Sequence, residues 1–263
     1  MAGKVLCEAT KLYNVQNQCT FLPRLAERHY LCLTGRIIYC NLSHIITAIN
    51  AKWDSDGKFI MHLDVDVESM RYIIVYESST YSLSDSAPAI DCADSIEESS
   101  QFPVQILSGD YEKFSALYSF LRTPVSLYNI RELESLNSYP VEILPGKLYM
   151  GDYRQATNLQ ILKDLKLNVL VSVSDECSNC TVLHIRKSDL ITSFERMCVF
   201  IGSHLNNSSS VLIFSTLGVS RCCAVTIAYF MYHLKYTLKE AWNHIQQCKA
   251  NMRPNRGFVL QQQ

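Results

Sequence analysis

An arginine follows a serine after five intervening residues, in a segment whose residue types suit the binding of phosphate. Segment 211–221 reads VLIFSTLGVSR. Backbone N–H groups in succession, a helix N-terminus and a guanidinium that forms two parallel hydrogen bonds together bind an oxyanion. We expect residues 211–214 to form a buried strand, Gly218 to permit a tight turn, and residues 219–234 to form the following helix. The candidate phosphate-binding residues are Ser215, Thr216, Leu217, Gly218, Val219, Ser220 and Arg221.

The same segment lacks the groups that would attack a bound phosphate. It resembles the phosphate-binding loop of the cysteine phosphatases, in which His-Cys, five residues and Arg follow one another, but Phe214 and Ser215 stand at the His and Cys positions. A thiol has a pKa of roughly 8.5, which a positive loop lowers further. A serine hydroxyl is a weak nucleophile without an adjacent base, and Phe214 is no base. The sequence therefore predicts a site that holds phosphate without cleaving it.

Composition limits the cellular setting. The chain has 263 residues, 48% of them hydrophobic, which is enough for a sizeable core in one or two domains. A net charge of -1 gives no general attraction to nucleic acid or to anionic membranes. The sequence shows neither a secretory signal nor a run of about 20 apolar residues. Together with 11 cysteines, an odd number, this favours a reducing compartment. We expect a cytoplasmic protein and leave mitochondrial association open.

Buried strands alternate with helices along both halves of the chain, which indicates an α/β fold. A Ser-rich, acidic stretch from Ser78 to Ser100 ends in a weak helix, 89–98. Expected strands in the first half are 30–33, 71–76 and 102–107, and a helix is expected over 110–121. Expected strands in the second half are 141–144, 148–151, 168–173, 181–185 and 211–214, and expected helices are 159–165 and 190–205. Thr237 to Glu240 has the pattern of a capping box that opens a further helix.

Several segments of the second half together resemble a dual-specificity phosphatase domain. They are Val141–Gly151, the loop 211–221, and Asn251–Phe258. The first half resembles the rhodanese-like domain that precedes the catalytic domain in MAP-kinase phosphatases, on the segments Leu31–Arg36, Ser43–Ile45, Ala48–Asn50 and Ile106–Phe114. The whole layout, with Phe-Ser in the loop, is similar to the serine/threonine/tyrosine-interacting-like pseudophosphatases. The resemblance implies an α/β rhodanese-like domain (1–124), a linker (125–138) and a dual-specificity-phosphatase-like domain (139–263) with a shortened C-terminal helix.

Departures from these families weigh against activity in either domain. An active phosphatase would carry a general-acid aspartate between residues 185 and 194, where Asp189 looks like a helix cap. Cys222 replaces the hydroxyl expected after Arg221. A sulfurtransferase would begin the loop after strand 71–76 with cysteine, whereas this chain has Glu77-Ser78-Ser79-Thr80. The kinase-docking arginines of MAP-kinase phosphatases have only Lys52 and Lys58 as counterparts, so kinase docking is weakly supported.

The cysteines leave two alternatives to weigh. Cys222 or Cys223 could be a displaced nucleophile, but on a helix beyond Arg221, where side chains point away from the loop or into the core, they are better interpreted as buried, inert thiols. Cys177 and Cys180 form a single C-x-x-C pair, and zinc needs four ligands. We therefore expect neither metal nor cofactor, and structural roles for His44, His184, His204, His233 and His244.

These observations predict a catalytically inactive phosphatase relative that binds partner proteins as a competitor or scaffold in signalling. The expected partners are signalling proteins, among them phosphoproteins or other phosphatases, with no nucleic acid. Two alternatives stay open: an interaction protein whose anion pocket is vestigial, and a working phosphatase with unusual chemistry, which would need a base beside Ser215.

Overall fold

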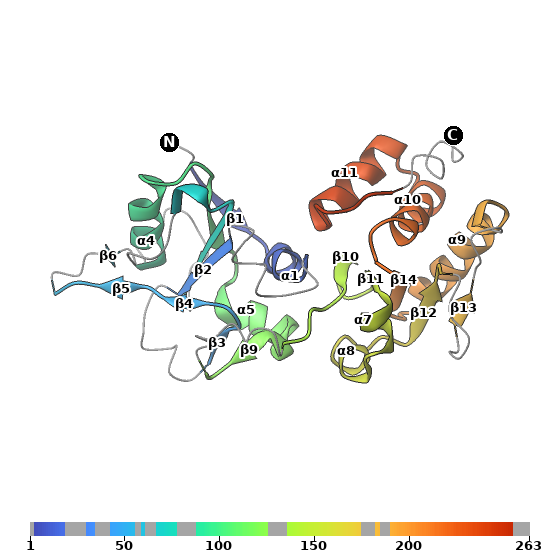
Figure 1. The fold of residues 1–263 in the computed structure, drawn as a ribbon, viewed down its shortest axis with the longest axis horizontal. Helices are drawn as coiled ribbons and strands as arrows, with labels where there is room; N and C mark the ends of the chain where they lie inside the picture. The colour runs from blue at the N-terminus through green and yellow to red at the C-terminus, as the bar shows by residue number, and fades with distance from the viewer. Residues whose placement is uncertain are drawn as a thin grey trace. The chain divides into compact units, whose positions relative to one another are not determined.

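A computed structural model describes residues 3–18, 30–34, 43–55, 59–60, 67–77, 88–125, 136–174, 182–184 and 190–254 (Figure 1). The chain divides into two compact units, Met1–Asn137 and Ser138–Gln263. Most of the predicted linker, 126–135, lies outside the described residues.

Five described strands of the first unit form a parallel sheet in the order β1-β8-β7-β2-β4. Their bounds are β1 (Lys4–Cys7), β2 (Tyr30–Thr34), β4 (Ile49–Asn50), β7 (Tyr72–Tyr76) and β8 (Val104–Leu107). Two small antiparallel pairs join β3 (His44–Ile45) to β9 (Arg122–Thr123) and β5 (Lys52–Trp53) to β6 (Phe59–Ile60). The helical segments are α1 (Ala9–Asn17), η1 (Val67–Ser69), α4 (Pro88–Glu97), α5 (Asp110–Leu117) and η2 (Ser119–Leu121).

The core of the first unit lies between α4 and the central strands. Four residues of β7, 73–76, are buried, as expected of a strand covered on both faces. Ala89, Cys92, Ala93 and Ile96 of α4 pack against the side chains of β7 and β8 in one cluster. The weak helix predicted over 89–98 is therefore an ordinary core helix, because its small and apolar residues recur at helical spacing.

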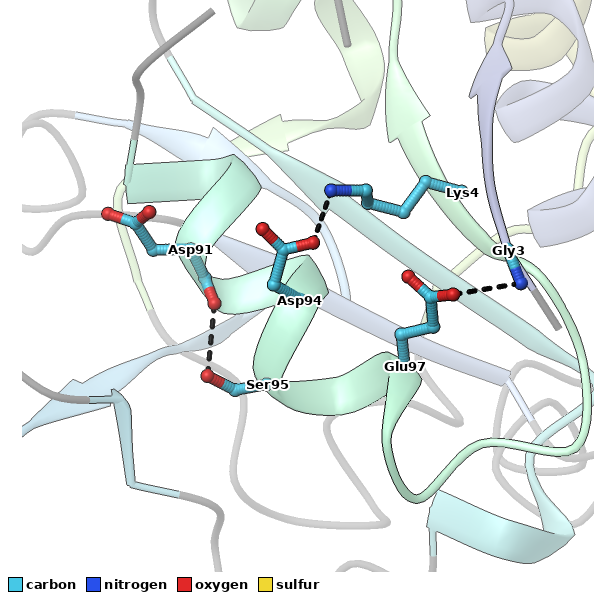
Figure 2. A network of polar contacts seen from close by, with 6 residues as sticks. All are labelled: Gly3, Lys4, Asp91, Asp94, Ser95 and Glu97. Atoms are coloured by element: carbon cyan, nitrogen blue, oxygen red, sulfur yellow. Dashed lines mark hydrogen bonds and ion pairs between the residues drawn. The ribbon is translucent and has the colours of Figure 1, made fainter. Parts of the chain in front are cut away.

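The edge strand β1 is held to α4 by polar contacts (Figure 2). Lys4 forms an ion pair with Asp94, and the Gly3 backbone N–H donates to Glu97 Oε1 at 3.1 Å. Within α4, Ser95 Oγ donates to the Asp91 carbonyl oxygen at 3.0 Å. These contacts connect the first residues of the chain to the helix that covers the sheet.

Five described strands of the second unit form a sheet in the order β10-β11-β14-β12-β13. The bounds are β10 (Val141–Leu144), β11 (Leu148–Asp152), β12 (Val169–Ser172), β13 (Val182–His184) and β14 (Val211–Ser215). Strands β10 and β11 are antiparallel, while the other neighbours are parallel. The helices are α7 (Tyr153–Thr157), α8 (Leu159–Asp164), α9 (Leu190–Asn206), α10 (Arg221–His233) and α11 (Leu238–Cys248).

Helices α9, α10 and α11 share one core with the sheet of the second unit. The buried residues of this core include Met197 and Ile201 of α9, Val225 of α10, and Ala241 and Ile245 of α11. Residues 222–230 of α10 are buried without interruption, which fits a helix packed on several sides.

Local signals in the sequence define two boundaries of this unit. The hairpin between β10 and β11 turns at Gly146, whose φ of 67° suits a residue without a Cβ, so the predicted strand pair is confirmed. The predicted capping box is confirmed as well. Thr237 accepts a hydrogen bond from the Glu240 backbone N–H, and Glu240 accepts one from the Thr237 backbone N–H at 2.7 Å.

Other boundaries differ from the sequence-based expectation. The predicted helix 110–121 ends at Leu117, because Tyr118 leaves the helical conformation and stacks on Tyr13 with ring centroids 4.5 Å apart. The predicted helix 219–234 begins only at Arg221. Strand β1 and helix α1 were not predicted. None of the helices in the described ranges has the length and apolar character needed to cross a membrane.

Candidate functional site

The candidate loop lies where a central parallel strand meets a helix N-terminus (Figure 1). Strand β14 runs between β11 and β12, all five of its residues are buried, and it ends at Ser215. Residues 216–220 form the loop, and α10 begins at Arg221. Ligands of α/β proteins bind at this end of parallel strands, where free N–H groups of the helix face them. The structure therefore brings the predicted residues 215–221 together in one continuous turn.

Phe214 belongs to the core and not to the loop surface. Its side chain is 1% exposed, and its ring lies 6.5 Å from that of Tyr153, between centroids. The Phe214 carbonyl oxygen accepts a hydrogen bond from the Val173 N–H at 2.8 Å, which fixes the strand end. This position supplies packing where a catalytic loop would have an imidazole.

Gly218 is required by the shape of the loop. Its φ is 64°, a conformation that residues with a Cβ rarely adopt. A Cβ at this position would lie 2.8 Å from the backbone C and O of Gly151 and 3.0 Å from the Asp152 backbone N. The loop is thus seated directly on the end of β11.

Backbone N–H groups of the loop have unequal roles. The Gly218 N–H donates to the Ser215 carbonyl oxygen at 3.2 Å and so closes the turn. In the described part of the chain, no hydrogen bond uses the N–H groups of Thr216, Leu217, Val219 or Ser220. Four of the predicted amide donors therefore remain for an anion, while that of Gly218 serves the loop itself.

Ser215 makes its side-chain hydrogen bond with a thiol. The Ser215 side chain is 3% exposed, and its Oγ donates to Cys222 Sγ at 3.5 Å. In the sheet Ser215 lies in register with Asp152 of β11. The Asp152 carboxylate is engaged as the N-cap of α7, where it accepts from the Gln155 N–H at 2.9 Å. The capping box of this helix went unpredicted, although Asp-x-x-Gln at 152–155 is a sequence signal for it.

The two adjacent thiols are both buried in the core, as expected, and Cys222 also contacts Ser215 at the end of β14. Burial raises the pKa of Cys222, yet hydrogen bonds from Cys223 and Ser215 and the charge of Lys249 outweigh it and lower this pKa. The pKa of Cys223 is raised by its hydrogen bond to Cys222 and by burial. Cys223 Sγ lies 3.2 Å from the Val219 carbonyl oxygen, so its single hydrogen serves either this oxygen or Cys222. The thiols thus connect the strand end to the loop.

The segment after α11 closes over the same loop. The Arg253 backbone N–H donates to the Val219 carbonyl oxygen at 2.8 Å. Lys249 is only 7% exposed, and its charge acts on Cys222 and Cys223. Sequence reasoning missed Lys249, because a single lysine at the end of a helix carries no signal that a loop 30 residues earlier in the chain lies beside it.

Glu77, at the head of the corresponding loop in the first unit, has a structural partner. It directly follows the central strand β7, and its Oε2 accepts a hydrogen bond from the Ala89 N–H at 3.3 Å, near the start of α4. The carboxylate thereby occupies a helix N-terminus that could otherwise face an external anion.

Several sequence-based assignments lie outside the described residues. They are Ser78–Thr80, Cys177–Cys180, Asp189, Lys58 and Asn255–Phe258. Across the residues that the structure does describe, no three or more His, Cys, Asp or Glu side chains are grouped so that they could hold a metal ion. Two of the histidines bind backbone carbonyl oxygens, His233 that of Cys198 and His244 that of Ile143.

Residues 148–262 match the family model of the dual specificity phosphatase catalytic domain. The second unit is thus a dual-specificity-phosphatase-like domain, and the α/β fold class expected from the sequence is confirmed.

One curated relative extends the similarity into the first unit. A probable rhodanese domain-containing dual specificity protein phosphatase of Dictyostelium discoideum is 30% identical over 171 residues, which cover 60% of this chain and 36% of that protein. Human dual specificity protein phosphatase 5 is 30% identical over 132 residues, which cover 46% of this chain and 34% of that protein. The chain thus spans about a third of the length of these curated relatives.

Solved structures match about half of this chain. The human tyrosine phosphatase-like serine/threonine/tyrosine-interacting protein is 26% identical, with a TM-score of 0.44, over 47% of this chain and 93% of that one.

Proposed function

We propose that this chain is a catalytically inactive phosphatase relative whose second unit binds phosphorylated partner proteins and acts as a competitor or scaffold in signalling. The observation that supports this proposal most directly is the position and hydrogen bonding of Ser215. This serine ends β14 behind the buried Phe214 and donates its only side-chain hydrogen to Cys222. The proposal agrees with the similarity of the layout to the serine/threonine/tyrosine-interacting-like pseudophosphatases.

Attack on phosphorus would need a base that takes the Ser215 proton. Asp152 is in register with Ser215, so it is the first candidate for that base. Its carboxylate, however, caps α7 through the Gln155 N–H, and Gln155 in turn binds the Asp152 N–H at 3.0 Å. The Asp152 carboxylate is therefore engaged at the N-terminus of its own helix, and in the described part of the chain no hydrogen bond joins it to Ser215.

Binding of phosphate needs fewer groups than cleavage does. The expected donors for phosphate are the N-terminus of the 13-residue helix α10, the guanidinium of Arg221, and the backbone N–H groups of Thr216, Leu217, Val219 and Ser220. Leu217 is 74% exposed, so the loop is accessible at its tip. These features support a site that keeps its affinity for phosphate without a nucleophile.

A phosphopeptide titration tests this proposal. We expect a phosphotyrosine peptide to bind the protein in calorimetry while its unphosphorylated form does not. Arg221→Met should weaken binding about tenfold or more, because it removes hydrogen bonds to a charged group, and Arg221→Lys should recover part of the loss. Arg196→Met, an exposed arginine of α9, is the control and should leave binding unchanged.

The alternatives predict different titrations. A vestigial pocket would show no binding at millimolar phosphopeptide, and that result would remove phosphate recognition from the proposal. Binding that survives Arg221→Met would place the ligand elsewhere. An active enzyme would release phosphate from the peptide during the titration.

Partner class and location belong to the same proposal. The partners that suit a competitor best are signalling phosphoproteins and other phosphatases that bind the same ligands as this chain. Kinase docking has only Lys52 in its favour among the described residues. The described cysteines are all free, which supports a cytoplasmic location.

A further inference from the structure

Ser215 and Cys222 form a hydrogen-bonded pair at the end of β14, in which the hydroxyl is the stronger donor because a thiol donates only weakly. Ser215 Oγ is the donor and Cys222 Sγ the acceptor, 3.5 Å apart. Both side chains are buried, at 3% and 0% exposure. Water therefore has little access to replace this hydrogen bond.

The pair is held in place from several sides. Ser215 is fixed by the pairing of β14 with β11, and Cys222 lies in the first turn of α10. Thr226 Oγ1 donates to the Cys222 carbonyl oxygen at 2.8 Å, and Cys223 Sγ lies 3.2 Å from the Val219 carbonyl oxygen. The serine therefore has a partner of fixed position whether or not an anion is bound.

The direction of this hydrogen bond determines what Ser215 offers to a ligand. A serine hydroxyl has one hydrogen and two lone pairs. With the hydrogen directed to sulfur, only the lone pairs remain for an anion seated on the loop. They repel an ionised phosphate oxygen but accept a hydrogen bond from a protonated one.

We propose that Cys222 is a positioning residue of the anion site, which takes the Ser215 hydrogen and so makes the site favour the singly protonated phosphate monoester over the dianion. This inference rests on the proposed function, because it requires that phosphate binds at residues 215–221.

The expected effect of Cys222→Ala follows from the release of that hydrogen. Ser215 can then donate to the ligand, and hydrogen bonds to charged groups are strong enough to tighten binding of phenyl phosphate about tenfold at pH 8. Phosphate esters lose their second proton at a pH of about 6. At pH 5, where the monoanion dominates, the variant and the wild type should differ little.

Other charged groups around the pair are common to both proteins. They are Asp152 on β11, Arg221 and Cys223 on α10, and Lys249 after α11. The variant keeps Asp152, Arg221 and Lys249, so their charges act alike in both proteins. The loss of Cys222 also changes the pKa of Cys223, and comparison with the Ser215→Ala background separates that effect from the Ser215 hydrogen bond. Cys198→Ala is the matched control, because it deletes an equally buried thiol from α9 in the same core.

A double-mutant cycle on phenyl phosphate binding at pH 8 and pH 5 tests the inference, with Cys222→Val as the second variant if the alanine variant does not fold. We expect Cys222→Ala to tighten binding at pH 8 only when Ser215 is present, and no tightening in the Ser215→Ala background. Equal tightening in both backgrounds would reveal repacking and overturn the inference. So would unchanged affinity in Cys222→Ala with Arg221-dependent binding intact.

Ser215→Ala alone provides a test that leaves Cys222 untouched. In the wild type the Ser215 hydrogen is directed to Cys222, so Ser215 gives no hydrogen bond to a bound phosphate dianion. The Ser215→Ala variant should therefore bind phenyl phosphate at pH 8 at least as tightly as the wild type. Weaker binding would show that Ser215 donates to the ligand, and the inference would fail. Absence of binding in the wild type would instead count against the proposed function and, with it, this inference.

Discussion

Phe214 and Ser215 occupy adjacent positions at the end of β14, and their side chains have different environments. Phe214 packs against Tyr153 in the interior, whereas Ser215 contacts Cys222 below the loop. Neither side chain disturbs the turn, which depends on Gly218 and on the register between β14 and β11. Phosphate binding and phosphate-ester cleavage are therefore separable, because they depend on different atoms of the loop.

Gly218→Ala should impair the loop more than the same change at Gly146. Both glycines have positive φ, 64° and 67°, so both pay the conformational cost of about 1–2 kcal/mol. Only at Gly218 would the new Cβ meet backbone, 2.8 Å from Gly151 C, while Gly146 has nothing within 4 Å. Urea unfolding should show the larger loss for Gly218→Ala, and phosphate binding should vanish in that variant alone. Equal losses at both positions would contradict this description of the loop.

Phe214→His with Ser215→Cys should restore weak turnover of an activated aryl phosphate. The double variant regains a thiolate on a loop that still has Gly218 and Arg221. Phosphoserine peptides should react far more slowly, because general acid–base help is worth about 10²–10⁴-fold and their leaving group needs a proton. Rapid-quench kinetics should show a burst followed by slow turnover. A folded double variant with neither burst nor turnover would show that the loop geometry is unsuited to catalysis.

Residue types and spacing were enough to predict the loop but not its surroundings. Ser215 to Arg221 are contiguous, so the chain itself places them together. The contacts of Ser215 with Cys222 and of Val219 with Arg253 depend on how α10 and the segment after α11 pack. Such packing leaves no periodic signal, which is why the contact between Cys222 and Ser215 was not predicted.

Elements with continuous apolar sequences were predicted well. Strands β7 and β14 are buried along almost their whole length, because a short, continuous apolar run fits a sheet strand that is covered on both faces. Strand β1 was missed because it is a half-exposed edge, with Val5 at 40% and Leu6 at 44% exposure. Its position is determined by pairing with β8 and by contacts with α4, which a local pattern does not reveal.

Thr237→Ala should destabilise the second unit by about 1 kcal/mol, because it removes the N-cap of α11. Hydrogen bonds from the Thr237 backbone and side chain lower the pKa of Glu240. The contribution of this carboxylate is therefore complete above its unfolded-state pKa and is lost as the pH falls through the lower folded value. Urea unfolding at neutral and acidic pH should show a smaller effect of Glu240→Gln in acid. Gln247→Ala, exposed in the same helix, is the control, and an equal loss there would argue against the cap.

On the scale of the whole molecule, the division at Asn137 and Ser138 assigns the entire candidate site to the second unit. Tyr139 anchors the start of this unit, since its hydroxyl donates to Asp164 Oδ2 at 2.7 Å. Gln155 Nε2 also donates to the Ser138 carbonyl oxygen at 3.1 Å. The second unit thus has its own core and its own N-terminal attachment.

A fragment of residues 138–263 should fold and bind phenyl phosphate as tightly as the full chain. A fragment that begins at Val141 should be less stable, because it lacks Tyr139 and leaves Asp164 and Gln155 without these partners. Thermal melts and calorimetry of both fragments check this. A folded 138–263 fragment with much weaker binding would show that the first unit contributes to the site.

The most direct test of phosphate binding without cleavage is a ³¹P NMR time course of phenyl phosphate with the 263-residue chain at neutral pH. We expect saturable broadening of the ester signal, which Arg221→Met shifts to ester concentrations about tenfold higher or more. No inorganic phosphate should accumulate beyond a protein-free sample. Growth of the inorganic phosphate signal that disappears in Ser215→Ala would contradict the account, as would an ester signal that the protein leaves unchanged.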